Sequence, residues 1–255
     1  SAYALEEAKK DGNFEKYGYT TSTDATSFGT FMNINRTYYA NLNDAGKVVT
    51  TQTYDDAERT GYAMANVHFR RAIAFALDRA AYNAQSVGED LKLISVINSY
   101  TPGDFVQLTE DVTIDGLGTF KAGTYYGEVM QAQIDKDGFP VKVWDPNGNS
   151  GLGSSAGFDG WYNVDNAVKE LNTAIEELKA VGVEITKENP IYLDLPTCTV
   201  GQIYINRANS YKQSVEAALG GLVIVNCTSC ESAADWYYAG YYCDYGYECN
   251  YNLYD

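Results

Sequence analysis

The chain has 255 residues, of which 45% are hydrophobic and 20% charged, and this composition favours a folded globular protein over a disordered one. Its 18 Lys and Arg against 34 Asp and Glu give a formal net charge of −16 with no basic cluster, which argues against binding to nucleic acid. No run of eighteen apolar residues occurs, so the sequence predicts no membrane-spanning helix.

The first quarter of the chain predicts a short helix and one strand. Tyr3 to Lys10 reads as a helix ended by Asp11 and Gly12. Phe28 to Arg36 alternates apolar and polar residues, which predicts a strand. The candidates for burial on this strand are Phe28, Phe31 or Met32, and Ile34. Residues 37–65 are interpreted as an insertion with a hairpin around Asn43 to Gly46.

Asn66 to Arg79 is the clearest amphipathic helix of the sequence, and it is expected to continue to Val87 and to end at Gly88. Asn66 is a residue type that caps helices by accepting a backbone N–H of the first turn. Apolar residues recur at helical spacing and predict one buried stripe, made of Phe69, Ala72, Ile73, Ala76, Leu77 and Ala80.

The middle of the chain gives weak signals. Asp90 to Ser99 is compatible with either a helix or a strand, and a loop is expected at Tyr100 to Gly103. Residues 106–160 are rich in Gly, Asp and turn dipeptides and predict short strands and loops and little else, with strands at Val112 to Ile114 and Val141 to Trp144.

The last third alternates helical and strand patterns. Helices are predicted at Asp165 to Ala180, with Gly182 at its C-terminal end, and at Gln202 to Leu219, with Gly220 and Gly221 as the stop. Strands are predicted at Ile191 to Leu195 and at Leu222 to Val225. This alternation predicts an α/β fold, a mixed sheet flanked by helices.

The helix motif resembles that of a known family. Arg70, Ala72, Ala76, Asp78 and Arg79 are spaced as in the second lobe of extracytoplasmic solute-binding proteins of the oligopeptide and dipeptide class, family 5, which feed ABC importers. Residues 169–225 resemble the same lobe through Ala174, Leu178, Gly182, Pro190, Ile191, Leu193, Ser214, Leu219 and Gly220. The resemblance implies a periplasmic-binding-protein-like type II lobe spanning residues 1–255, with insertions at 37–65 and 106–160.

The resemblance also implies a ligand-binding segment at Ala239 to Asp255. On this match Asp244 takes the place of the carboxylate that receives the α-ammonium group of a peptide, with Tyr245 and Tyr241 as further ligand-binding residues. Tyr241 replaces a Trp of the family, and no Pro follows Tyr245. A carboxylate at a cleft selects a cation because a part-buried charge needs a partner.

The implied function is capture of extended peptides for import without catalysis, in partnership with a first lobe and with ABC permease subunits. The implied location is extracellular, with membrane contact only through a lipid anchor outside this chain. Ser1 and Ala2 resemble a cloning remnant, so the chain is expected to be a piece of a longer secreted protein. No cofactor and no bound metal are expected. The alternative is a tyrosine-rich surface adhesion module, because the chain has 23 Tyr and many of them cluster towards the C-terminus.

The cysteines leave three possibilities open. Cys198, Cys227, Cys230, Cys243 and Cys249 could form one or two disulfides, remain thiols, or supply a zinc site, although the spacing from Cys243 to Cys249 is long for zinc. A calcium loop at Asp145 to Gly151 fits poorly, since Ala156 stands where a bidentate Glu is required.

Catalysis has little support in the sequence. His68 is the only histidine, and its place in the first turn of the central helix favours a capping or surface role. No G-x-S-x-G, P-loop or H-E-x-x-H motif occurs. A glycosidase stays formally open because two carboxylates suffice for that reaction, but no pair stands out.

Overall fold

A computed structural model describes residues 2–19, 28–39, 50–93, 96–144 and 160–255. The chain falls into two compact units. One comprises Ser1–Gly29 and Arg79–Trp161, and the other comprises Thr30–Asp78 and Tyr162–Asp255. The second unit carries the candidate site, so it is described first.

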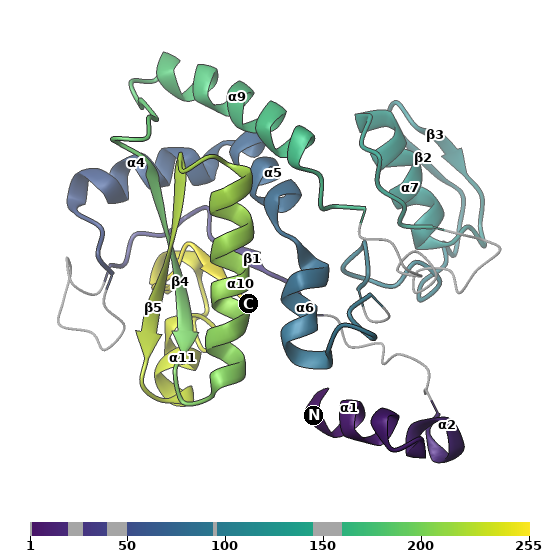
Figure 1. The fold of residues 1–255 in the computed structure, drawn as a ribbon. Helices are drawn as coiled ribbons and strands as arrows, with labels where there is room; N and C mark the ends of the chain where they lie inside the picture. The colour runs from purple at the N-terminus through teal and green to yellow at the C-terminus, as the bar shows by residue number, and fades with distance from the viewer. Residues whose placement is uncertain (1, 20–27, 40–49, 94–95, 145–159) are drawn as a thin grey trace. The chain divides into compact units, whose positions relative to one another are not determined.

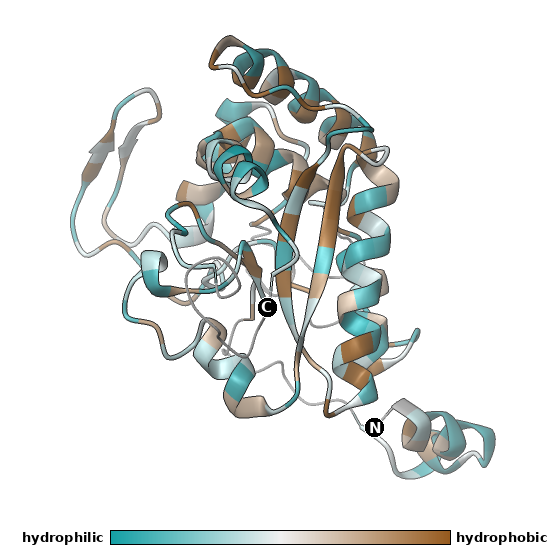
Figure 2. Ribbon diagram, turned by 90° about the vertical axis from the view of Figure 1, so that its left-hand side faces the viewer, coloured by the Kyte–Doolittle hydropathy of each residue, from teal (hydrophilic) through white to brown (hydrophobic). Residues whose placement is uncertain are grey.

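Two parallel strands form the centre of this unit (Figure 1). β4 (Ile191–Cys198) pairs in register with β5 (Val223–Cys230), and helix α10 (Gln202–Ala218) connects them. Apolar residues predominate in the first halves of both strands (Figure 2), where helices cover the sheet. Gly220 and Gly221 end α10 with positive φ angles of 61° and 76°, so the predicted helix, stop and strands are confirmed.

Helices α4 (Tyr54–Ala65), α5 (Val67–Ala76) and α9 (Val164–Ala180) pack against one another in the same unit. The predicted stripe of α5 is buried through Leu77, with Phe69, Ala72, Ile73 and Ala76 fully inaccessible. Asn66 caps α5 as predicted, since its side chain accepts the Phe69 N–H at 3.0 Å. Small alanines on α5 and α9 allow the two helices to approach closely.

The predicted continuation of the central helix to Val87 is wrong. α5 ends at Ala76, Leu77 is extended with ψ 113°, and α6 starts afresh at Arg79 (Arg79–Val87). The Phe75 carbonyl accepts the N–H of Asn163 at 2.9 Å. In an unbroken helix that carbonyl would accept the N–H of Arg79, so a tertiary hydrogen bond replaces the helical one.

The strand predicted at Phe28 to Arg36 is much shorter and buries its other face. β1 (Phe31–Met32) pairs antiparallel with β6 (Leu253–Tyr254). Of the side chains expected inside, Phe28 is 91% exposed, Phe31 52% and Ile34 59%, and only Met32 is partly buried. Asn33 and Arg36 are buried instead. The reason is that polar groups of β4 and the β6 segment lie behind β1, so its polar residues find hydrogen-bond partners there.

The other unit contains small elements. These are α1 (Ala2–Lys10), α2 (Asn13–Tyr17), α6, β2 (Val112–Ile114), β3 (Gly118–Phe120) and α7 (Tyr126–Asp137). The helix at the start of the chain, the end of α6 before Gly88 and the strand β2 are confirmed. Residues 90–93 and 96–99 form turns and irregular structure rather than the helix or strand considered.

Helix α7 corrects the prediction that residues 106–160 hold only strands and loops. It begins where Glu128 accepts the Tyr125 N–H at 3.1 Å and ends at Gly138, whose φ is 75°. Val141 to Trp144 is not a strand. Its backbone is held by Gln131 of α7, whose side chain bonds the Val141 carbonyl and the Val143 N–H.

The α/β class is confirmed: within the described residues, helices accompany three two-stranded sheets, two of them antiparallel and one parallel. The hairpin predicted at Asn43 to Gly46 and the possible calcium loop at Asp145 to Gly151 lie outside the described residues. No helix within the described ranges combines the length and the apolar character of a membrane span.

Candidate functional site

The three residues predicted to contact ligand lie in the segment between helix α11 (Ala233–Ala239) and strand β6. Tyr241 and Tyr245 are 70% and 59% exposed, and Asp244 is exposed between them in sequence. A short 3-10 helix, η1 (Gly246–Glu248), follows directly. We call residues 240–249, from the end of α11 through η1, the acidic loop.

The base of the acidic loop is fixed by aromatic packing. The Trp236 and Tyr254 rings stack with centroids 4.7 Å apart, and the Tyr254 hydroxyl donates to the Trp236 carbonyl at 2.9 Å. A Cβ on Gly240 would lie 2.8 Å from the rings of Tyr251 and Tyr254. Only glycine therefore allows the chain to leave α11 this close to the two rings.

The segment after β1 ties down the far end of the acidic loop. The Asn33 side-chain amide donates to the Gly246 carbonyl at 2.7 Å, and the Thr37 hydroxyl donates to the Tyr247 carbonyl at 3.0 Å. These residues are more than 200 positions apart in the chain. The loop that carries Asp244 is therefore held by a segment near the other end of the sequence, directly after β1.

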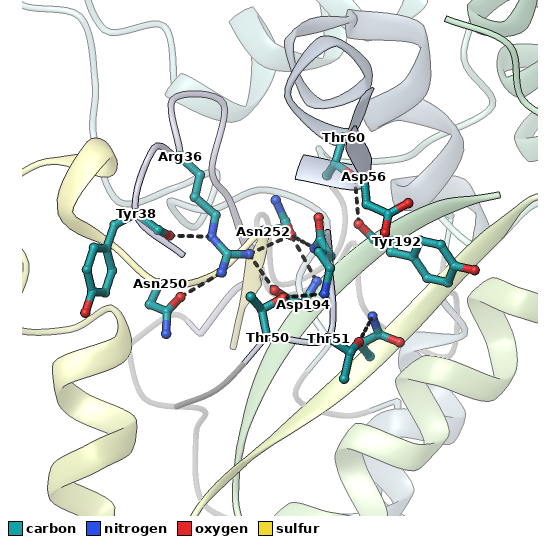
Figure 3. Close-up of polar contacts among 12 residues, drawn as sticks. Arg36, Tyr38, Thr50, Thr51, Asp56, Thr60, Tyr192, Asp194, Asn250 and Asn252 are labelled. Carbon is teal, nitrogen blue, oxygen red and sulfur yellow. Dashed lines mark hydrogen bonds and ion pairs between the residues drawn. The ribbon is translucent and has the colours of Figure 1, made fainter. Parts of the chain in front are cut away.

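A buried polar network lies beside these contacts (Figure 3). The Arg36 guanidinium donates to Asp194 Oδ2 at 2.7 Å, to Asn252 Oδ1 at 2.9 Å and to Asn250 Oδ1 at 2.7 Å. Its Nε donates to the Tyr38 carbonyl at 3.0 Å. Side chains of Arg36 and Asp194 are 2% and 1% exposed, so the ion pair is shielded from water.

Asn252 links this network to the sheet. Its side-chain oxygen also accepts the backbone N–H of Asp194 at 3.0 Å and the Gln52 amide at 2.9 Å. Its backbone N–H donates to the Asp194 carbonyl at 3.0 Å. The network thus joins the segments around β1, β4 and β6, and it positions the chain directly after the acidic loop.

Tyr39 completes the surroundings of Arg36. The guanidinium carbon lies 3.8 Å from the centroid of the Tyr39 ring, a cation–π contact. Burial raises the pKa of Tyr39, and the charge of Arg36 acts in the opposite direction. The ring therefore stays neutral and keeps its face available to the cation.

Sequence reasoning missed this network. The available signal was a polar alternation in the last strand segment, Asn250 and Asn252, together with a charged residue inside the apolar pattern of Ile191 to Leu195. Charged residues are seldom buried without a partner, so Asp194 in that strand indicated a cation elsewhere in the chain. Nothing in the local sequence identified that cation as Arg36.

The cysteines are all free thiols in the structure. Burial, then hydrogen bonding and proximity to Cys249, raises the pKa of the Cys243 thiol to about 12. Burial likewise raises the pKa of Cys230 to about 12. Within the ranges that the structure describes, no group of three or more His, Cys, Asp or Glu side chains is placed to hold a metal ion.

His68 joins two helices. Its Nδ1 lies 2.7 Å from Glu170 Oε2 of α9, and its Nε2 lies 3.7 Å from Glu177 Oε1. The histidine therefore has a structural contact between α5 and α9, at a position remote in sequence from the acidic loop.

Most of the chain is similar in sequence to proteins of streptococci. It is 33% identical to the oligopeptide-binding protein AmiA of Streptococcus pneumoniae over 79% of this chain and 26% of that protein. It is 29% identical to the oligopeptide-binding protein AliB of S. pneumoniae over 88% of this chain and 31% of that protein. It is 30% identical to the oligopeptide-binding protein SarA of Streptococcus gordonii over 84% of this chain and 27% of that protein.

The chain spans about a quarter to a third of the length of these relatives. No protein-family model matches it. A crystal structure of Haemophilus influenzae OppA in complex with RPPGFSPFR aligns with 99% of this chain and 32% of that chain, at 15% identity and a TM-score of 0.43.

Proposed function

The resemblance to the oligopeptide-binding proteins is confirmed, and from it we propose that this chain is a ligand-binding lobe of such a protein, which captures extended peptides for an ABC importer without catalysis. The observation that carries the proposal is the sequence similarity, which extends over most of the chain. The tyrosine-rich adhesion module is not favoured, because the relatives bear the name oligopeptide-binding protein.

Asp244 supplies the anionic contact in this proposal. It is exposed on the acidic loop, and within the described residues no ion pair to it is formed. The stacked rings of Trp236 and Tyr254 pack at the base of the loop. Hydrogen bonds from Asn33 and Thr37 hold its far end. A carboxylate on a fixed loop costs little reorganisation when it meets the α-ammonium group of a peptide.

The partners follow from the same proposal. A first lobe, supplied by residues outside this chain, closes over the peptide, and ABC permease subunits receive it. The protein works outside the cytoplasmic membrane, where a lipid anchor holds it. Half of a two-lobed site offers half of the contacts, so this chain alone is expected to bind peptides weakly or undetectably.

The direct test uses the full-length protein that contains this chain and isothermal titration calorimetry with alanine pentapeptide. N-acetylation of the peptide removes its charge, and Asp244→Asn removes the carboxylate. Each change alone is expected to weaken binding about 10-fold or more, because a charged hydrogen bond contributes about 1.5–3 kcal/mol.

The two changes together must cost little more than either alone, because they remove the same contact. Glu231→Gln provides a control carboxylate that precedes α11 and lies outside the acidic loop. Full-strength binding of the acetylated peptide to the unaltered protein would show that Asp244 does not receive the ammonium group. Absence of any peptide binding would reject the proposed function.

A further inference from the structure

Tyrosine rings gather on and next to the acidic loop. Tyr237 of α11 lies with its ring centroid 5.5 Å from that of Tyr241 and 5.3 Å from that of Tyr242. The rings of Tyr245 and Tyr247 stack 5.3 Å apart and are nearly parallel, at 6°. We call Tyr237, Tyr238, Tyr241, Tyr242, Tyr245 and Tyr247 the tyrosine platform.

The platform faces solvent rather than a core. Tyr238 and Tyr241 are 71% and 70% exposed, and Tyr242, Tyr245 and Tyr247 are exposed as well. The rings below it, Trp236 and Tyr254, are the ones that pack against buried Cys230 and Ala239. The core therefore uses Trp236, Tyr251 and Tyr254, and the exposed rings of the platform are available to a ligand.

The segment that carries the platform has side-chain charge of one sign. Residues 217–255 contain no Lys or Arg. Asp244 and Glu248 of the acidic loop are both exposed, and neither forms an ion pair within the part of the chain that the structure describes. The ring faces add to this field, because the face of an aromatic ring is its negative region.

An exposed set of ring faces edged by carboxylates attracts cations and repels anions. Cation–π attraction and carboxylate pairing act on the same side chain, whereas a purely apolar group gains only contact area. The same protein already uses this pairing inside, where the Arg36 guanidinium lies over the Tyr39 ring.

Resting on the proposed function, we propose that the tyrosine platform binds the side chain of an arginine or lysine near the N-terminus of the peptide, so that the substrate class is peptides that begin with basic residues. In the proposed function Asp244 receives the α-ammonium group. Tyr245 is the next residue in the chain and directly precedes η1. In this proposal the first side chain of the peptide contacts the stacked rings of Tyr245 and Tyr247.

The test compares three pentapeptides that differ only in their first residue, which is arginine, norleucine or glutamate, followed by four alanines. Binding to the full-length protein is measured by calorimetry at low salt and at high salt. The arginine peptide is expected to bind about 10-fold more tightly than the norleucine peptide at low salt, and salt must reduce that ratio because it screens the carboxylates. The glutamate peptide is expected to bind most weakly.

The matched variants are the double substitution Tyr245→Leu with Tyr247→Leu and the control Tyr17→Leu, an exposed tyrosine of α2. The double variant must lower the arginine-to-norleucine ratio to less than about 2-fold, and the control must leave it unchanged. If the double variant fails to fold, the single substitutions Tyr245→Leu and Tyr247→Leu replace it, and an unchanged ratio in both would overturn the inference.

The outcomes separate this inference from the proposed function. Equal, measurable affinity for the arginine and norleucine peptides would overturn the inference and leave peptide capture intact, whereas failure of all free peptides to bind would reject peptide capture. Binding of a chitin oligosaccharide that displaces the arginine peptide through the same two tyrosines would also overturn it, because that platform would then serve sugars.

Discussion

The guanidinium of Arg36 lies 2.7 Å from the carboxylate of Asp194, and both side chains are almost completely buried although 158 residues separate them in the chain. Arg36 stands four residues beyond β1, and Asp194 stands in the centre of β4. The ion pair therefore holds the segment after β1 against β4. Asn250 and Asn252, which directly follow the acidic loop, bind the same guanidinium.

Removal of one partner of this pair should be costly. Arg36→Met is expected to lower the free energy of unfolding by about 3–5 kcal/mol, since it leaves a buried carboxylate without its cation. Equilibrium unfolding in urea measures the loss. Asp194→Asn in the Arg36→Met background must cost less than it does alone, and additive losses would show that the two charges do not interact.

An exposed pair provides the control for that measurement. Lys9 and Asp90 also form an ion pair, but the Asp90 side chain is 61% exposed. Asp90→Ala is therefore expected to change the free energy of unfolding by less than about 1 kcal/mol.

Two glycines should respond to alanine in opposite directions. Gly240→Ala places a methyl group 2.8 Å from the rings of Tyr251 and Tyr254 and is expected to cost about 1–3 kcal/mol of stability. Gly61 lies within α4 with no atom within 4 Å of an added Cβ. Gly61→Ala is expected to stabilise the protein by about 0.5–1 kcal/mol, because it reduces the backbone entropy of the unfolded chain. Thermal unfolding of both variants measures the signs.

The side-chain ties from Asn33 and Thr37 should govern how often the acidic loop opens. Cys249 is 4% exposed and its thiol donates to the Tyr245 carbonyl at 3.5 Å, so it reports opening through its reaction with a disulfide reagent. Asn33→Ala or Thr37→Val is expected to speed labelling of Cys249 by about 2- to 10-fold, the equivalent of one hydrogen bond.

Mass spectrometry of the labelled peptide distinguishes Cys249 from the other cysteines. Thr173→Val is the matched control, because the Thr173 hydroxyl donates only to the Lys169 carbonyl of its own helix. Equal labelling rates in all variants would mean that Asn33 and Thr37 do not hold the loop.

Stability should fall as the solution becomes mildly alkaline. The pKa values of Cys230 and Cys243 are raised to about 12 in the folded protein, mainly by burial. An unfolded cysteine has a pKa of about 8.5, so between pH 8.5 and 12 the unfolded state loses its protons first and becomes relatively more stable. Below pH 8.5 the two thiols have no effect, because both states are protonated.

Thermal midpoints at pH 7.5, 8.5 and 9.5 test this expectation, and the comparison with Cys243→Ala separates the thiol from the tyrosines, which begin to titrate at the highest of these values. The midpoint temperature should decrease from pH 8.5 to pH 9.5. The Cys243→Ala substitution should make this decrease smaller. A fall of the same size in that variant would assign the pH dependence to other groups.

Asn66 should show two separable contributions. Its side-chain oxygen caps α5, and its amide donates to Glu177 Oε2 of α9 at 2.7 Å. Asn66→Ala removes both contacts and is expected to cost about 1–2 kcal/mol, whereas Asn66→Ser keeps a capping oxygen and should cost about half as much. Urea unfolding that finds the two variants equal would show that the cap contributes nothing.

The long helices and the buried strands were predictable from the sequence, because their signals are local. The spacing of apolar residues in α9 and α10, the cap at Asn66 and the glycines after each helix depend on neighbours within a few positions. The alternation of helix and strand likewise gave the α/β class. The helix motif and the segments around Gly182 and Pro190 were enough to indicate the family.

What the sequence could not give depended on distant partners. The Asn163 amide that interrupts the central helix is 88 residues from the Phe75 carbonyl (163 − 75), and Arg36 meets Asp194 and Asn252 only when three strands have assembled. Those partners also decided that the segment 28–36 buries Asn33 and Arg36 rather than Phe28 and Ile34. Helix propensity and period-2 alternation are properties of short windows, whereas a buried polar group is placed by whichever remote group can satisfy it, and only the tertiary structure identifies that group.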